Sequence, residues 1–307
     1  MMNESLNLEI WDHLIQGKAL NGLGLSTIEG RTDLRNLELP EPSIVRRFQF
    51  RKIPIAEIDP GAIIQGAKWR NLDFSDSKLN GLRLFGCEIE NCRFENCQLQ
   101  DLRLWSTKIS DASFQGANLR KSALGGVHEG RRNSYSGVDF TQTDLRQTAY
   151  TATSFDRCTF RNTKLEKVDF QTSAFSDCRF EGELLRVLFY RRAFKGEAYP
   201  ANEMINVDFR RAKLRYVEFR GLSLDRVLLP SDDEHIVIKN YPGALDRVIA
   251  VLQQRNDMPS RKLVAYLGIL RKWAAPNQVQ GVINTKDLVE VAGVEGMNCV
   301  RELLRQQ

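Results

Sequence analysis

The cysteines are the residues of this sequence whose spacing most suggests chemistry. Cys87, Cys92 and Cys97 follow one another at intervals of five residues, and three thiolates held together could bind a zinc ion. Small residues such as Ala112 and Ala117 continue the same spacing. We therefore interpret the thiols as small buried side chains in a reducing environment, and we expect no metal site and no disulfide framework.

The histidines give no support for catalysis. They are His13, His128 and His235. No serine, histidine and aspartate set, carboxylate pair or glycine-rich phosphate loop accompanies them in a recognisable motif. The sequence therefore predicts no catalytic residue and no bound cofactor, and we expect the protein not to be an enzyme.

A period of five residues organises the chain around these positions. A large aliphatic or phenylalanine side chain returns at every fifth residue from Phe74 to Leu124, and a smaller residue comes two positions before each. This period fits neither a helix nor a flat strand and indicates a repeat architecture. The pattern is interrupted over residues 125–137, disturbed over residues 183–204, and absent after residue 230.

Two pairs of residues beside the period-five positions are candidates for binding a partner. Arg83 and Phe85 precede Arg103 and Trp105 by twenty residues, at positions that the repeat directs outward. Arginine and aromatic side chains are enriched at protein interfaces. The alternative is that the N-terminal arm or the inserted loop covers these side chains within the chain.

Within the first interruption, residues 128–135 are predicted to be a protruding polar loop, and the repeat is expected to resume at Phe140. Loops carried by a rigid scaffold often hold functional residues, although an ordinary solvated loop is the alternative. The candidate partner-binding residues of this loop are His128, Arg131, Arg132 and Tyr135.

The net charge of +5 is modest for 307 residues and does not by itself imply a nucleic-acid partner. The basic excess lies late in the repeat region, around Arg210, Arg211, Arg215 and Arg220. These residues are either a solvated outer face or a patch for an anionic partner. Nucleic-acid binding by the patch would weaken steeply as the salt concentration rises.

Both ends of the chain show helical spacing of apolar residues. Residues 5–15 predict a short helix, and residues 246–254, 260–274, 286–292 and 297–306 predict further helices. We expect the apolar stripe of helix 260–274 to cover the open end of the repeats, and we interpret the last two helices as a cap rather than a DNA-reading motif.

With these residues identified, the chain resembles the pentapeptide-repeat family, whose repeat is summarised as A(D/N)LXX. Ala117-Asn118-Leu119-Arg120-Lys121 matches it literally, and Val168-Asp169-Phe170 and Val207-Asp208-Phe209 match it closely. The resemblance implies a mainly β fold, a right-handed quadrilateral β-helix in which four pentapeptides form each twenty-residue coil, here with an α-helical C-terminal cap.

We expect three parts: an N-terminal arm with a partial repeat (1–66), the β-helix (67–230) with its two loops, and a helical C-terminal domain (231–307). The N-terminus lacks the pattern of a secretion signal, and no apolar run is long enough to span a membrane. The expected location is therefore the cytoplasm.

The leading functional hypothesis is a non-enzymatic scaffold that binds a protein partner, with a homodimer as one form of such binding. The best-known branch of the resembled family protects DNA gyrase from quinolone inhibitors by imitating duplex DNA, which is the first alternative. Such mimicry needs an acidic surface, whereas residues 67–230 carry a net charge of +6. Nucleic-acid binding through the basic face is the second alternative.

Overall fold

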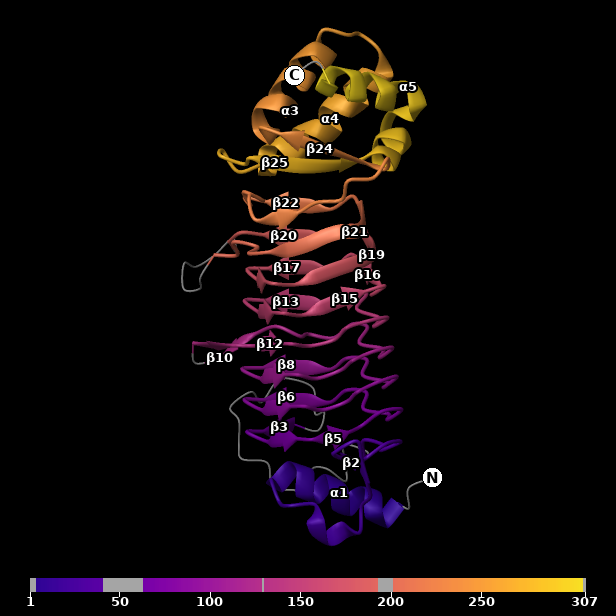
Figure 1. Cartoon of the computed structure of the whole chain (residues 1–307), viewed down its shortest axis with the longest axis vertical. Helices are drawn as coiled ribbons and strands as arrows, with labels where there is room; N and C mark the ends of the chain where they lie inside the picture. Colours follow the sequence, from indigo (N-terminus) through magenta and orange to yellow (C-terminus); the bar gives the residue numbers. More distant parts are fainter. Residues whose placement is uncertain (1–3, 41–62, 129, 193–200, 306–307) are drawn as a thin grey trace. The chain divides into compact units, whose positions relative to one another are not determined.

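The computed structural model describes residues 4–40, 63–128, 130–192 and 201–305. The chain forms two compact units, Met1–Lys164 and Leu165–Gln307. Strands predominate in the repeats and α-helices near the C-terminus (Figure 1), as the sequence predicts. In the described part of the chain, every helix is too short or too polar to cross a membrane.

One residue in each group of five turns the backbone. Asn91, Asn96 and Asp101 have φ angles of 51°, 56° and 58°, in the left-handed region that Asn, Asp and Gly enter at low cost. Such a residue recurs at every fifth position from Asn71 to Lys121. Between these corners the backbone is extended, so side chains alternate between the inside and the outside of the coil.

The first unit is a parallel β-helix with short strands. β6 pairs with β3 and β8, and β7 pairs with β4 and β9, always with partners twenty residues apart. The strands of this unit are β1 (Thr27–Ile28), β2 (Arg31–Asp33), β3 (Ile63–Gln65), β4 (Lys68–Arg70), β5 (Leu72–Asp73), β6 (Arg83–Phe85), β7 (Glu88–Glu90), β8 (Arg103–Trp105), β9 (Lys108–Ser110), β10 (Val127–His128), β11 (Arg131–Arg132), β12 (Ser134–Ser136), β13 (Ala149–Thr151), β14 (Ser154–Asp156) and β15 (Thr159–Arg161).

A column of stacked phenylalanine rings fills the first unit. Phe94 lies 5.0 Å from Phe74 and 4.9 Å from Phe114 between ring centroids, with nearly parallel ring planes. The column continues through Phe140 to Phe160. All these rings are buried, which confirms that the large period-five residues point inward and supply the hydrophobic core.

The predicted N-terminal helix is present as α1 (Glu4–Gln16). The buried Trp11 donates a hydrogen bond from Nε1 to the carbonyl of Glu38 at 2.8 Å, and its ring meets Trp69 edge-on at 6.5 Å. After the 3-10 turn η1 (Asn21–Leu23), β2 pairs in parallel with β5, and this pairing adds a partial coil. The sequence also predicts a strand-like connection over residues 48–66, most of which lies outside the described residues.

The first insertion is shorter than the sequence predicts. Lys108 pairs with Ser134, 26 residues later instead of twenty, so the coil contains six extra residues. The repeat resumes at Tyr135, five residues before Phe140, and both side chains are buried. The expectation of a loop protruding over residues 128–135 is therefore wrong at its C-terminal end, because Asn133 is buried and Ser134 and Tyr135 already belong to the next coil.

A buried asparagine closes this insertion. Asn133 is fully buried; its amide donates to the carbonyls of Leu104 and Leu124 at 2.9 and 3.0 Å, and its Oδ1 accepts the N–H of Thr107 at 2.9 Å. Three backbone groups that the insertion would leave unpaired are thereby satisfied. Asn133 fixes the point at which the chain re-enters the coil.

The second unit continues the same design. β17–β20–β22 and β19–β21–β23 are parallel sheets, and Phe189 stacks between Phe170 and Phe219 at 5.2 and 5.4 Å. Its repeat strands are β16 (Leu165–Glu166), β17 (Asp169–Gln171), β18 (Ala174–Ser176), β19 (Arg179–Leu185), β20 (Leu188–Tyr190), β21 (Val207–Arg215), β22 (Glu218–Arg220) and β23 (Val227–Leu228).

Much of the predicted second disturbance, residues 183–204, is regular coil. β19 ends at Leu185 and β20 covers Leu188–Tyr190. Continuing the period of five from Phe140 predicts Leu185 as an inward residue. The inward residue is instead Leu184, because Leu165 pairs with Leu184 after only nineteen residues. Asn202, fully buried, accepts the N–H groups of Phe175 and Met204, as Asn133 accepts Thr107. Residues 193–200 lie outside the described chain.

The C-terminal helices are α3 (Tyr241–Gln253), α4 (Met258–Trp273) and α5 (Thr285–Arg305), the last divided by non-helical backbone at Ala292 and Gly293. An antiparallel ribbon of β24 (His235–Lys239) and β25 (Gln280–Asn284) accompanies them and was not predicted. Forty residues separate these two strands, so local spacing gives no sign of their pairing.

The helices bury their apolar faces mainly against one another. Leu263 and Leu267 of α4 pack in a core that includes Leu245 of α3 and Leu288 and Val300 of α5. The expectation that the stripe of α4 covers the end of the repeats is therefore wrong for Leu263 and Leu267. The cause is that three amphipathic helices and a ribbon provide enough apolar surface for a separate core. The expectation is confirmed for Tyr266 and Trp273 of the same helix, which contact Tyr216 and Arg220 of the repeats.

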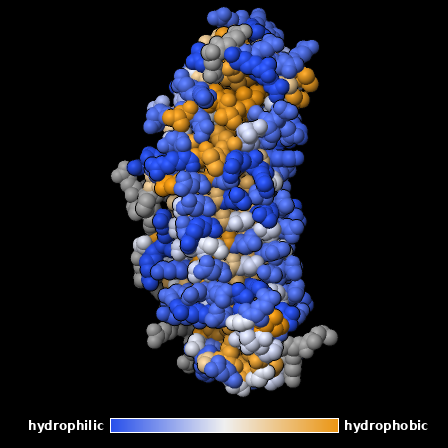
Figure 2. Space-filling model, in the orientation of Figure 1, coloured by the Kyte–Doolittle hydropathy of each residue, from blue (hydrophilic) through white to orange (hydrophobic). Residues whose placement is uncertain are grey.

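Among the described residues, the most exposed large apolar side chains lie in the second unit. Figure 2 shows a largely hydrophilic face, with apolar residues gathered in its upper part and near its lower end. The large apolar side chains with the greatest exposure among the described residues are Ile205, Leu228, Val237, Val251, Met258, Ile269, Val279 and Val294. The described surface of the first unit therefore offers mainly polar contacts.

Replacing the buried asparagine tests its role in the insertion. Asn133→Ala removes three hydrogen bonds and leaves buried backbone groups unpaired, so the free energy of unfolding should fall by about 2 to 4 kcal/mol in urea titrations. Asn118 is the control, because it is half-buried and its side chain accepts one local hydrogen bond, from Arg120. Asn118→Ala should lower the free energy of unfolding by less than about 1 kcal/mol. An equal decrease in the two variants would contradict the role of Asn133 in fixing the end of the insertion.

Candidate functional site

The four candidates Arg83, Phe85, Arg103 and Trp105 lie on adjacent strands, as predicted, but they are not an exposed ladder. Arg83 is 2% and Phe85 5% exposed, so neither is available to a partner at this surface. Both pairs are in register across β6 and β8, and the rings of Phe85 and Trp105 lie 6.4 Å apart. The prediction that both pairs are accessible to a partner is therefore wrong for Arg83 and Phe85, which are buried.

Asp101 holds both arginines of this set. Its Oδ2 atom accepts Nη2 of Arg83 at 2.6 Å, and its Oδ1 atom lies 3.3 Å from Nε of Arg103. A Cβ placed on Gly126 would lie 2.9 Å from Cδ1 of Trp105, so the start of the insertion passes close to this indole. The arrangement agrees with the alternative in which the chain itself covers these side chains.

The loop candidates divide between a hairpin and the core. β10 and β11 form an antiparallel hairpin in which Val127 pairs with Arg132 and His128 with Arg131. Arg131 is exposed and Arg132 half-buried; the side chain of His128 falls outside the described part of the structure. The two arginines are consecutive residues and together form the second strand, β11, of this hairpin, which comprises residues 127–132.

Tyr135 is not part of that exposed group. Its side chain is 2% exposed, its ring stacks on Phe155 at 5.0 Å, and its hydroxyl donates to the carbonyl of Leu124 at 2.8 Å. Burial raises the pKa of this hydroxyl well above its usual value. The prediction that Tyr135 contacts a partner is corrected, because the ring belongs to the hydrophobic column.

The predicted basic residues do not form one patch. Arg210 and Arg211 lie on β21, where Arg210 pairs with Asp208 at 2.8 Å and the side chain of Arg211 is 79% exposed. Arg215 and Arg220 are largely buried and are held by other groups. Only the first two are therefore accessible as a basic surface.

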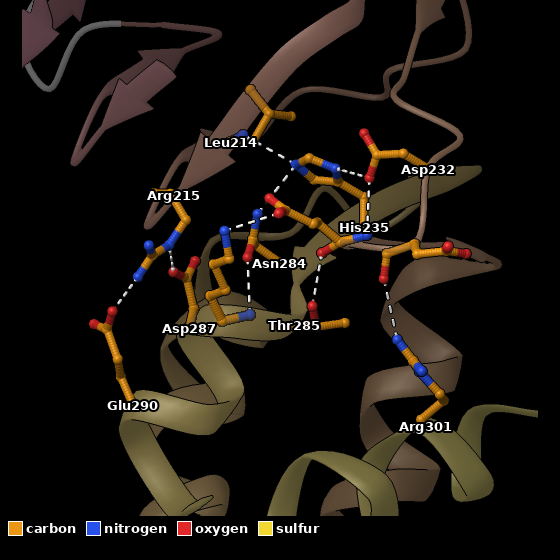
Figure 3. Close-up of polar contacts among 12 residues, drawn as sticks. Leu214, Arg215, Asp232, His235, Asn284, Thr285, Asp287, Glu290 and Arg301 are labelled. Carbon is orange, nitrogen blue, oxygen red and sulfur yellow. Dashed lines mark hydrogen bonds and ion pairs between the residues drawn. The ribbon is translucent and has the colours of Figure 1, made fainter. Parts of the chain in front are cut away.

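Arg215 joins the repeats to helix α5 (Figure 3). Its guanidinium contacts the carboxylates of Asp287 and Glu290, and the backbone N–H of Tyr216 donates to Asp287 at 2.7 Å. Burial raises the pKa of Asp287, while the bond from Arg215 opposes this shift. The Tyr216 hydroxyl and Arg215 lower the pKa of Glu290. This network is a structural junction between coil and helix.

His235 was not selected by the sequence analysis, yet it lies at the centre of a polar network in the same region (Figure 3). Its Nδ1 lies 2.7 Å from Asp232, and its Nε2 accepts the backbone N–H of Leu214 at 3.0 Å and lies 3.2 Å from the amide of Asn284. Although burial acts against it, the bond to His235 lowers the pKa of Asp232.

This histidine resembles a catalytic base only in having an aspartate partner. With a proton on Nδ1, the single lone pair of Nε2 is already used by a backbone N–H, so it cannot take a proton from a substrate without breaking the junction. The signal that could have identified it is a histidine three residues after an aspartate at the end of the repeats. Its role is to connect the last coils with the β24–β25 ribbon.

The thiols of the three spaced cysteines are buried in the coil. Burial raises the pKa of Cys87 to about 11 and those of Cys92 and Cys97 to about 12. Each Sγ faces a backbone carbonyl of the preceding coil, for example that of Phe74 at 2.9 Å from Cys97. Among the described residues, no three His, Cys, Asp or Glu side chains are grouped as metal ligands would be.

Comparison with protein families bears on this coil directly. The model for pentapeptide repeats matches residues 87–126 and 136–171, with eight copies. The chain contains pentapeptide repeats. The two matched segments flank the 127–132 hairpin, so the pentapeptide repeats are interrupted where the structure has its six-residue insertion.

Several solved structures are similar to this pentapeptide-repeat chain. QnrB1, a plasmid-mediated fluoroquinolone resistance protein, is 19% identical, with a TM-score of 0.34, over 51% of this chain and 84% of its own. HetL, involved in heterocyst differentiation regulation in the cyanobacterium Nostoc, is 15% identical, with a TM-score of 0.26, over 75% and 94%. Rfr23 from the cyanobacterium Cyanothece 51142 is 20% identical, with a TM-score of 0.20, over 38% and 82%. A comparison with curated proteins gives no significant match.

The ion pair at the junction can be tested by removing one partner. Arg215→Ala leaves the carboxylate of Asp287 buried without its cation, so the free energy of unfolding should fall by about 3 to 5 kcal/mol in denaturant titrations. The double variant Arg215→Ala/Asp287→Ala should lose less than the sum of the single variants.

The control for this pair is Arg271→Ala, because Arg271 and its partner Asp246 are 37% and 55% exposed. Such a pair contributes at most about 1 kcal/mol. If Arg215→Ala were as mild as the control, the assignment of Arg215 as the structural link would be wrong.

Proposed function

We propose that this protein is a non-enzymatic cytoplasmic scaffold that binds a protein partner through the 127–132 hairpin. The observation that carries the proposal is that the hairpin interrupts the repeats without disturbing them: strands on both sides remain paired, with β12 bonded to β9. A chain that only needed a regular coil would gain nothing from this insertion.

The base of the hairpin is fixed, which suits a binding element. Asn133 and Tyr135 anchor its exit, and the hydroxyl of Ser106 donates to the carbonyl of Arg131 at 3.2 Å. A segment already held in place loses less conformational entropy when it binds. The rigid coil beneath it serves as the scaffold.

The charge of the hairpin indicates the kind of partner. Arg131 and Arg132 follow each other, and the sole acidic residue between Val127 and Arg132 is Glu129. Guanidinium groups form paired hydrogen bonds with carboxylates, so these arginines favour a partner with an acidic surface.

The proposed frame of the scaffold is the right-handed quadrilateral coil of four pentapeptides. The left-handed corner at every fifth residue and the twenty-residue pairing of strands support this form. We divide the chain into an arm (1–66), the coil (67–230) and a helical domain (231–307), and a second copy of the chain is one possible protein partner.

Deletion of residues 127–132 is the sharpest test. It removes the six inserted residues and places Leu124 five positions before Tyr135, which restores the regular period. The variant should keep the β-type circular dichroism spectrum and the melting temperature of the full chain to within a few degrees. Both proteins are immobilised and exposed to a lysate of the source organism, and the captured proteins are identified by mass spectrometry. The deletion variant should fail to capture the partner that the full chain captures.

Two charge variants separate the arginines from general electrostatics. Arg131→Ala/Arg132→Ala should reduce capture about tenfold, whereas Arg161→Ala/Lys164→Ala removes two exposed cations elsewhere in the same unit and should leave capture unchanged. Unaltered capture by the deletion variant would place the binding surface elsewhere on the molecule.

A further inference from the structure

A cleft of about 630 Å³ lies in the second unit, between the ends of the last coils and the C-terminal end of α4. Its volume is in the range of pockets that bind small molecules. β20 and β22 contribute Tyr190 and Arg220, and α4 contributes Lys272 and Trp273. The hairpin of the proposed function belongs to the other unit, so the cleft is an independent feature.

Arg220 is held in a fixed position in this cleft. Its guanidinium lies 4.4 Å over the ring of Trp273 and 5.0 Å from that of Tyr190. Nε donates to Glu218 at 2.8 Å and Nη1 to the Tyr190 hydroxyl at 2.7 Å. Nη2 makes no hydrogen bond within the described chain, and the side chain is 17% exposed. One edge of a preorganised guanidinium therefore remains for a ligand.

The cleft carries an excess of positive charge. Its cationic residues are Arg191, Arg192, Arg220, Arg226 and Lys272, and its acidic residues are Glu203 and Asp225. Glu218 behind Arg220 adds a third carboxylate. The cationic side chains that line the cleft therefore outnumber the carboxylates named here.

Lys272 is the cation with the fewest partners. Its Nζ lies 5.3 Å over the ring of Trp273 and has no carboxylate within ion-pair distance among the described residues. At the end of α4, the carbonyl of Trp273 accepts the N–H of Gly221 at 2.8 Å, which ties this end of the helix to the corner after β22.

We infer that the cleft binds a small molecule through a phosphate or carboxylate group, held between Arg220 and Lys272. A planar guanidinium with a free edge donates to two oxygens of such a group, and the ammonium of Lys272 adds a second charge. Cationic groups partly removed from water attract an anion more strongly than fully exposed ones.

Trp273 provides a probe within the site. The chain has four tryptophans, and emission from Trp273 should change when an anion moves between Arg220 and Lys272. Titration of the full chain with inorganic phosphate and with succinate, at constant ionic strength set by chloride, should give a saturable change. Saturation by one anion alone identifies the group that the cleft prefers. Trp273→Phe should abolish the signal, and isothermal calorimetry should detect the same binding in that variant.

Charge variants decide whether the cleft is the site. Lys272→Gln should raise the dissociation constant of the anion about tenfold. Arg211→Gln removes an exposed cation that does not line the cleft, so it should leave the dissociation constant unchanged. A linear response without saturation, or equal weakening by the two variants, would overturn the inference. Both variants alter exposed or cleft-lining side chains, so their thermal unfolding should match that of the original chain.

Discussion

The structure depends on a backbone turn at every fifth residue. Residues such as Asn91, Asn96 and Asp101 take a left-handed conformation there, and each turn fixes which of the next four side chains point inward. The phenylalanine column and the hydrogen bonds between coils follow from that geometry, because partners twenty residues apart come into register. From Asn71 to Asp111 most corners are Asn, Asp or Gly, which tolerate this conformation better than other residues.

The sequence predicts the parts of the fold that repeat or have local periodicity. The inward series from Phe74 to Leu124 and the C-terminal helices are confirmed, because each is encoded by residues close in sequence. Tyr135 was assigned to a loop because it follows a polar segment that conceals its place in the period. Leu184 was missed because the coil shortens by one residue there.

The sites were harder to predict because their geometry comes from distant residues. Arg83 looks outward in the repeat, yet it is buried, and the sequence contains no local sign of this. Arg215 looks like one of several basic surface residues until Asp287, 72 positions later, is placed beside it. In both cases the residue type was informative, whereas its exposure was decided by tertiary structure.

The two buried asparagines make the register of the next coil independent of the number of residues inserted before it. Asn133 and Asn202 each accept a backbone N–H group of the preceding coil, so the position of each asparagine is fixed by that coil. Evolution can therefore lengthen, shorten or replace such a segment without new compensating changes in the core. A lineage could acquire different binding specificities at these corners while its folded framework stays the same.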